Sequence, residues 1–322
     1  MKIAISDSCG LKFSQDIMDH WIAKGHEVRY ERGASEFLAQ WADIYYIDWV
    51  DNNINYLFDI YKGKHEEHPN WQTYKRPKFV VRAIDYDIWC GGAKNQDLID
   101  FVDTWICIAP HMEKKLREDA DFGDKLHLIR PGVNLEKFTL KSKVTDGFQL
   151  GMVLGDFWPQ AKNHMGGLDI FTTLFRQDNR WRLHIRGQHE VGEYWPIMYD
   201  HYLESRGIKD VVTLYGQQQD MNQWYENISI LLHPGMKEAF CYAVGESLSK
   251  GICVIFNDFY GSKDIWSNNL FDICSYKTHE EAVEKISAMR KYPINSESNR
   301  KYIEDNYSLE RMLRDYDELL GL

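Results

Sequence analysis

Residues 229–266 constrain the fold more than any other part of the chain. They begin with a short apolar run, Ser229–His233, which is typical of a buried parallel strand and is followed by a Pro-Gly turn. From Phe240 the apolar residues recur at helical spacing up to Gly251, a residue type that often ends helices. A second apolar run, Ile252–Phe256, predicts another buried strand. The stretch therefore predicts a strand, a helix and a strand, the repeating unit of parallel α/β folds.

Two glutamates, Glu238 and Glu246, lie in the loop and helix of this unit with seven residues between them. Open α/β sheets bind ligands at the carboxyl ends of strands and the amino ends of helices, which is where this loop is expected. At ~1.5 Å per residue the two carboxylates are about 12 Å apart along a helix, which suits the two polar ends of one long ligand. Alternatively, Glu238 lies in the first turn, where its charge interacts favourably with the helix dipole, and Glu246 is solvated.

The order of Pro234, Glu238, Ala239, Phe240 and Glu246, before a buried strand and a glycine loop, resembles the Glu-x7-Glu signature of the family 4 retaining glycosyltransferases. The segment 130–138 is similar to the strand-and-turn exit from the first domain of that family, Pro-x-Gly-Val-Asp-x-x-x-Phe. The resemblance implies an α/β protein of GT-B fold. Two Rossmann-like domains are then expected to face each other across a cleft, and a C-terminal helix to return to the first domain.

Strand and helix patterns, together with the resemblance, predict the domain boundaries. Residues 1–140 are expected to form an acceptor-side Rossmann-like domain, and the polar segment 141–147 the linker. Residues 148–301 are expected to form the Rossmann-like domain that binds the nucleotide sugar, and residues 302–322 the helix that crosses back.

The resemblance also implies roles for residues at the donor site. Glu238 would contact hydroxyls of the donor sugar, Glu246 the ribose hydroxyls, and Lys162 the diphosphate. Relatives carry an Arg directly after the glycine that corresponds to Gly155, but this chain has Asp156, so His164 or Arg186 is expected to assist Lys162. The predicted donor-binding residues are Lys162, Asn163, Gly155, Arg186, Gln217, Ala239, Phe240, Cys241 and Glu246.

The predicted catalytic residues are Glu238, Asp85 and Asp87. Family members often place a histidine near the donor sugar at the end of the fourth strand, and its position corresponds to Ile84 here. The two aspartates that follow are the expected substitutes. Aspartates that cap a loop would give the same sequence pattern.

The predicted acceptor-binding residues are Gly10, Trp71, Lys75, Arg76 and His111. Gly10 belongs to a loop of small residues after the first strand, and segment 65–78 mixes aromatic and basic side chains. Such a mixture can stack on a ring while its cations hold a phosphate, although a solvated loop with one buried aromatic residue fits as well. The acceptors considered are a glycan, a lipid-linked carrier and, as a minority option, a hydroxymethylated DNA base.

Composition narrows the classes of protein further. The 322 residues carry a net charge of -11, with an acidic excess in both halves, which disfavours broad nucleic-acid or membrane binding. The six cysteines are scattered, as expected of reduced thiols in a cytoplasmic protein, and we expect no signal peptide and no transmembrane segment. No metal-ligand spacing is evident, so neither a metal nor a cofactor beyond the nucleotide-sugar co-substrate is predicted.

The sequence thus predicts a metal-independent retaining glycosyltransferase, a hexosyl- or pentosyltransferase that uses a UDP- or GDP-linked sugar. A nucleotide-sugar epimerase and a catalytically idle sugar-nucleotide-binding protein of the same fold are the alternatives. The Glu-x7-Glu pattern argues against the epimerase, whereas Ile84 and Asp156 favour the idle protein. The acceptor and the oligomeric state do not follow from the sequence.

Overall fold

The computed structural model describes residues 1–11, 13–64, 70–84, 92–142, 145–153, 162–187, 194–216, 220–266, 268–291 and 296–322. Its contacts divide the chain into two compact units. The first unit comprises Met1–Arg130 and Met312–Leu322, and the second comprises Pro131–Arg311. This division falls before the linker predicted at 141–147.

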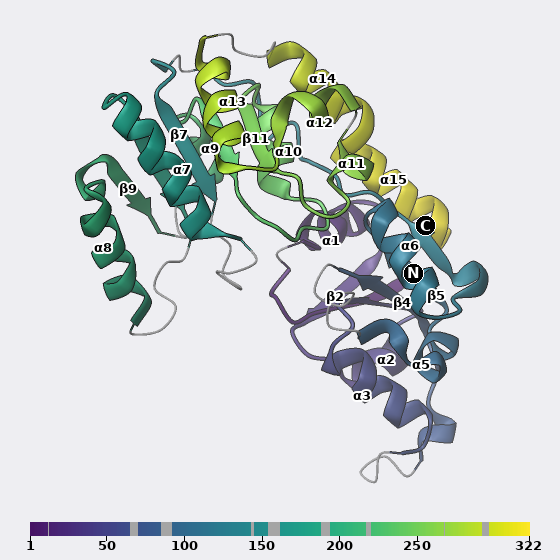
Figure 1. Ribbon diagram of the computed structural model, residues 1–322. Helices are drawn as coiled ribbons and strands as arrows, with labels where there is room; N and C mark the ends of the chain where they lie inside the picture. Colours follow the sequence, from purple (N-terminus) through teal and green to yellow (C-terminus); the bar gives the residue numbers. More distant parts are fainter. Residues whose placement is uncertain are drawn as a thin grey trace. The chain divides into compact units, whose positions relative to one another are not determined.

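The first unit contains a six-stranded parallel sheet with helices between the strands (Figure 1). Its strands are β1 (Lys2–Asp7), β2 (Glu27–Glu31), β3 (Ile44–Asp48), β4 (Lys78–Ala83), β5 (Thr104–Cys107) and β6 (Leu126–Leu128). Its helices are α1 (Gln15–Ala23), α2 (Glu36–Trp41), α3 (Asn52–Tyr61), α5 (Gln96–Phe101), α6 (Pro110–Asp119) and three short 3-10 turns, η1 (Trp71–Thr73), η2 (Gly92–Lys94) and η3 (Gly123–Lys125).

The strand order of the first sheet is β2-β1-β3-β4-β5-β6. Strand β3 is buried along its whole length, as expected for a central strand covered by helices on both faces. Local signals fix the helix starts: the Ser35 hydroxyl caps α2 by accepting from the amide of Leu38, and Pro110 opens α6.

The second unit has a parallel sheet of the same size with its own helices. Its strands are β7 (Gln149–Val153), β8 (Arg182–Arg186), β9 (Val212–Tyr215), β10 (Ile230–His233), β11 (Cys253–Asn257) and β12 (Ser275–Tyr276). Its helices are α7 (His164–Gln177), α8 (Tyr194–Arg206), η4 (Lys209–Val211), α9 (Met221–Tyr225), α10 (Tyr242–Ser249), α11 (Ser262–Ile265), α12 (Asn268–Cys274), α13 (His279–Lys291) and α14 (Ser296–Tyr307).

The strand order of the second sheet is β12-β11-β10-β7-β8-β9. This is the order of a dinucleotide-binding sheet, in which the connections wind outward in both directions from the two central strands. The predicted strand-helix-strand unit is confirmed as β10, α10 and β11. Gly251 ends α10 with a φ of 73°, a conformation that glycine adopts without strain.

The C-terminal segment consists of two helices, whereas we predicted a single helix over 302–322. Helix α14 is followed by α15 (Leu309–Leu320), and Ser308 between them forms an isolated parallel bridge with Val133. The last eleven residues belong to the first unit. There Tyr316 packs against Trp21 and Tyr46, and its hydroxyl lies 3.2 Å from that of Tyr46. Because the end of the chain packs on the first unit, helix α15 needs an apolar face to bury there.

Candidate active site

The central strands of the second sheet, β7 and β10, are the point at which its winding direction changes. Strands β7, β8 and β9 proceed toward one edge, whereas β10, β11 and β12 proceed toward the other. Open α/β sheets bind their ligands at the carboxyl ends of the strands at such a point. Lys162 follows β7 and Glu238 follows β10, so the fold brings these two predicted residues together.

Lys162 and Glu238 form an ion pair in which the ammonium group donates to Oε1 of the buried carboxylate. His233, the last residue of β10, places its Nε2 atom 3.2 Å from the same oxygen. Burial favours the neutral acid, yet Lys162 and His233 lower the pKa of Glu238 to about 2. The carboxylate therefore stays ionised at neutral pH.

His233 was not among the predicted site residues. Burial opposes a charge on its ring, but Cys241 and Glu238 raise the pKa of His233 to about 9. Two cations, Lys162 and protonated His233, thus surround one carboxylate, and this arrangement favours an additional anionic group nearby. The signal in the sequence was the position of His233 at the end of an apolar strand, which we assigned only to the strand.

The segment between Glu238 and α10 contributes mainly to packing. Ala239 and Phe240 are buried, and the ring of Phe240 contacts those of Trp266 and Tyr307. The predicted donor contact of Phe240 therefore does not involve its ring, which belongs to the aromatic core. Cys241 precedes α10 with a φ of 46°, a left-handed conformation that is uncommon for a residue with a side chain.

Glu246 lies on α10 and accepts a hydrogen bond of 2.7 Å from the hydroxyl of Tyr225, the last residue of α9. Burial raises the pKa of Glu246 to about 7, although the bond from Tyr225 acts in the opposite direction. The two glutamates of the Glu-x7-Glu pattern therefore differ: Glu238 is held ionised, whereas Glu246 titrates near neutral pH.

Asn163, His164 and Arg186 are the other predicted residues near the diphosphate, and of the two expected to assist Lys162, His164 and Arg186, only Arg186 carries a charge. Asn163 precedes α7 in a left-handed conformation, with a φ of 49°. Burial and the nearby Lys162 charge lower the pKa of His164, the first residue of α7, to about 4. His164 is therefore neutral at pH 7 and does not add the expected positive charge. Arg186 is buried at the carboxyl end of β8, on the same edge of the sheet, and remains charged.

The first sheet also changes its winding direction, between β1 and β3, and a buried polar network occupies that position. The Ser14 hydroxyl lies 2.8 Å from Oδ2 of Asp7 and 2.9 Å from Oδ2 of Asp48, and Arg82 pairs with Asp48 through two nitrogens. One hydroxyl proton serves only one of these carboxyl groups, and burial raises the pKa of Asp48 despite the opposing effect of Arg82. Sequence patterns missed this network because its members belong to separate elements.

Gly10 follows β1 and donates its amide to the carbonyl oxygen of Asp7, with a φ of 81°. Lys75 and Arg76 precede β4, and they pair with Asp43 and Asp103. In a parallel sheet, residues that precede a strand lie at the opposite edge from residues that follow one. The structure therefore does not bring Lys75 and Arg76 together with Gly10, contrary to the expectation of one shared acceptor site.

His111 is buried in the first turn of α6, at the carboxyl end of β5 and thus on the same edge of the sheet as Gly10. Trp71 begins η1, but its side chain lies outside what the structure describes. The predicted residues Asp85, Asp87, Gly155 and Gln217 also lie outside the described residues, so their assignments remain predictions.

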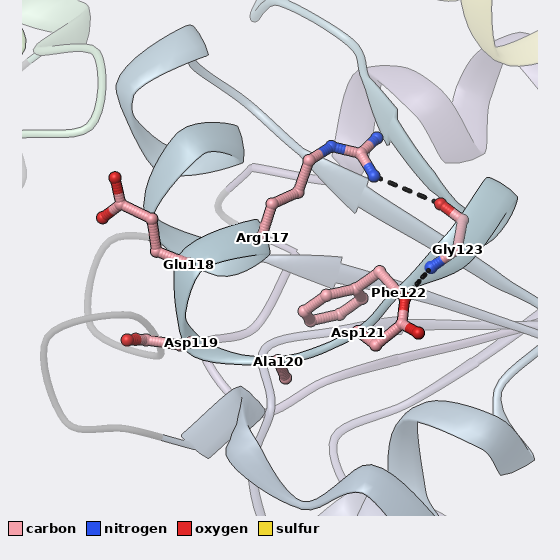
Figure 2. A pocket seen from close by; sticks show the side chains of 7 residues that line it. All are labelled: Arg117, Glu118, Asp119, Ala120, Asp121, Phe122 and Gly123. Carbon is pink, nitrogen blue, oxygen red and sulfur yellow. Dashed lines mark hydrogen bonds between the residues drawn. The ribbon is translucent and has the colours of Figure 1, made fainter.

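A shallow hollow of about 420 Å³ lies at the carboxyl end of α6, lined by residues 117–123 (Figure 2). Arg117 donates to the carbonyl oxygen of Gly123 across it, at 3.1 Å, and Asp121 accepts from the Gly123 amide. One continuous helix-to-turn segment supplies the whole lining, and these hydrogen bonds stabilise the turn. The hollow belongs to the first unit, whereas Lys162 and Glu238 belong to the second.

Three side chains of the second unit form a group with metal-ligand chemistry, although the sequence spacing predicted none. One ligand atom from each of His233, Glu238 and Cys241 lies within 4.8 Å of the other two. The turn between β10 and α10 brings them together.

Among the described residues, no helix combines the length and the hydrophobicity that crossing a bilayer requires.

Comparisons with known proteins bear on the fold of the chain. Residues 152–308 match the family model described as Glycosyl transferases group 1. A search of curated proteins found no match. A solved glycosyltransferase from Rickettsia africae is similar at 14% identity with a TM-score of 0.69, and the match covers 99% of this chain and 97% of that chain. Sucrose-phosphate synthase from Thermosynechococcus elongatus is similar at 12% identity with a TM-score of 0.74, over 100% of this chain and 98% of that chain. Anabaena HepE in complex with UDP-glucose is similar at 12% identity with a TM-score of 0.71, over 100% of this chain and 99% of that chain. These likenesses confirm the predicted GT-B fold with its two Rossmann-like domains.

Proposed function

We propose that this chain, which carries a glycosyl transferases group 1 domain within a GT-B fold, moves a sugar from a nucleotide-sugar donor to an acceptor with retention of anomeric configuration. The observation that carries the proposal is the group at the switch point of the second sheet, where Lys162 and His233 surround the carboxylate of Glu238. A nucleotide sugar offers a partner to each: a diphosphate for the cations and sugar hydroxyls for the carboxylate.

In this proposal Lys162 exchanges its bond to Glu238 for one to the donor diphosphate. Glu238 then accepts hydrogen bonds from sugar hydroxyls, and Glu246 accepts from the ribose. Arg186, at the end of the neighbouring strand, adds a second permanent cation on the diphosphate side. As the bond to the sugar breaks, negative charge grows on the leaving diphosphate, where cations already in place stabilise it without reorganisation.

The acceptor is proposed to bind at the carboxyl edge of the first sheet, near Gly10 and His111. Among the proposed acceptors, a glycan or lipid-linked carrier is favoured over a DNA base. Lys75 and Arg76, the cations first considered for phosphate contacts, are each matched by an aspartate.

A thermal-shift panel of nucleotide sugars tests the donor class. A ligand present at 100 times its dissociation constant stabilises the folded state by about 2.7 kcal/mol, which is readily seen as a rise in Tm. We expect a UDP- or GDP-sugar to raise the Tm and nucleoside diphosphate to be released when an acceptor is present. Recovery of a donor epimerised at C2 would instead support an epimerase, and binding without any turnover an idle protein.

We expect transfer to be independent of divalent metal ions, because Lys162 and Arg186 can neutralise the diphosphate. Activity measured before and after treatment with EDTA should therefore be equal. A loss that is restored by Mn²⁺ or Mg²⁺ would contradict this expectation.

A further inference from the structure

The side chains of His233, Glu238 and Cys241 form a compact group in the turn from β10 to α10. Their relative exposures are 3%, 6% and 7%, so all three are more than nine-tenths buried. Nε2 of His233 is 3.2 Å from Oε1 of Glu238, and one atom of each residue lies within 4.8 Å of the others. In a tetrahedral zinc site, bond lengths of ~2.0–2.3 Å place neighbouring ligand atoms about 3.4 Å apart. Movements of about 1 Å or less would therefore complete such a geometry.

The main chain passes close to this group of side chains. A Cβ atom at Gly235 would lie 2.7 Å from Nε2 of His233 and 3.2 Å from Oε1 of Glu238, so the main chain approaches both groups at this glycine. Cys241 carries its thiol on a left-handed residue, a conformation that is strained for any residue other than glycine. Such strain concentrates at functional sites.

The donor set and its charges suit zinc. An imidazole nitrogen, a carboxylate oxygen and a thiolate sulfur are the ligand types of Zn²⁺, whereas Mg²⁺ and Ca²⁺ prefer oxygen alone. The negative charges of the Glu238 carboxylate and of a metal-bound cysteine thiolate would balance one divalent cation. Lys162, whose side chain is 26% exposed, can leave the carboxylate when the metal replaces it as the positive partner.

We propose that His233, Glu238 and Cys241 bind Zn²⁺ through three protein ligands, with a fourth position left to water, and that the bound ion inhibits the protein. On binding, the thiol and the protonated imidazole each release a proton to solvent as the sulfur and nitrogen coordinate the metal. Inhibition, which rests on the proposed function, follows because the metal occupies the carboxylate oxygen that the donor sugar requires. Zinc would act as a regulator here and not as a catalyst.

Zn²⁺ binding to the full chain tests the proposal directly. Competition with a chromophoric chelator should show one tight site in the wild type and the same affinity in Cys9→Ser, which removes a more exposed thiol. Cys241→Ser and Cys241→Gly should each weaken binding at least about tenfold. The glycine variant is suited to the left-handed backbone, so its fold, checked by thermal unfolding, should be kept. Unchanged affinity in both Cys241 variants would overturn the proposal.

Co²⁺ gives a second readout, since a cobalt–thiolate bond produces a charge-transfer absorption band. The band should appear with wild type and Cys9→Ser and be absent with Cys241→Ser. A band that persists in Cys241→Ser would refute the assignment of Cys241 as a metal ligand.

Donor turnover separates the zinc site from the proposed function. Sugar transfer that is unaffected by Zn²⁺ at saturating occupancy would refute inhibition by the bound ion and leave the binding site standing. Normal zinc binding by a chain that turns over no nucleotide sugar would refute only the proposed function.

Discussion

At the scale of single residues, the environment gives two glutamates of one short segment opposite properties. Glu238 is buried beside two cations, so its pKa falls to about 2. Glu246 is half-buried beside the neutral hydroxyl of Tyr225, and desolvation of its carboxyl group raises its pKa to about 7. Divergent pKa values within one site are typical of groups with different chemical roles. The resemblance to the Glu-x7-Glu signature pointed to both residues, but their partners come from other elements and were not predictable.

Replacing Glu246 by glutamine should change how stability depends on pH. The folded state keeps the proton of Glu246 up to about pH 7, whereas the unfolded chain loses it near 4.5. Between these values the folded state binds more protons, so this group makes the free energy of unfolding fall as pH rises from 4.5 to 7 and adds no further slope above that. Glu246→Gln has no such proton, so its free energy of unfolding should not show this part of the decrease.

Urea denaturation of wild type and Glu246→Gln at several pH values measures the effect, since other titrating groups cancel in the difference. A stability difference that stays constant across the window would show that the folded state does not raise the pKa of Glu246.

At the scale of elements, apolar patterns predicted the central strands closely, and loops and breaks less well. The helix expected from Phe240 begins at Tyr242, because Cys241 adopts a left-handed conformation. The amphipathic pattern near the C-terminus runs through Ser308, where the helix nevertheless breaks because the backbone there bonds to that of Val133. The pairing of Arg76 with Asp103 and the Asp7–Asp48 network likewise depend on which strands become neighbours. Periodicity along the chain carries no information about such long-range contacts.

The packing of β7 at Gly151 gives a prediction at this scale. A Cβ atom there would lie 2.5 Å from Cδ1 of Ile228 and 2.9 Å from the ring of Trp224. Gly151→Ala should therefore lower the free energy of unfolding by about 1–3 kcal/mol. Gly33→Ala is the matched control, because no atom lies within 4 Å of its added methyl group. Comparable chemical-denaturation midpoints for the two variants would contradict this account of β7.

At the scale of the whole molecule, the two six-stranded parallel sheets differ in strand order. The first sheet winds outward from β1 and β3, with one strand beyond β1, whereas the second winds outward from β7 and β10, with two strands on either side, as dinucleotide-binding sheets do. The sequence predicted two Rossmann-like domains, but not this difference, because strand order is set by tertiary packing. We propose the donor site in the second unit because Lys162 and Glu238 meet at its switch point.

The overall charge predicts weak interaction with nucleic acid. With a net charge of -11, and with Lys75 and Arg76 paired with aspartates, the protein should show little affinity for duplex DNA even at low salt. Fluorescence anisotropy of labelled DNA with unmodified and hydroxymethylated bases measures this. Tight binding that falls steeply as salt rises would instead indicate several phosphate contacts and restore DNA as an acceptor.

Release of nucleoside diphosphate from a nucleotide sugar, compared between wild type and Glu238→Gln, tests the central claim most directly. Glu27→Gln, an exposed change on β2 of the first unit, is the matched control. We expect wild type and Glu27→Gln to turn over at equal rates. Glu238→Gln should be slower by about 10²-fold or more while still binding the donor in the thermal-shift assay. Equal rates for wild type and Glu238→Gln with a donor that the protein turns over would contradict the assignment of the active site to the switch point of the second sheet.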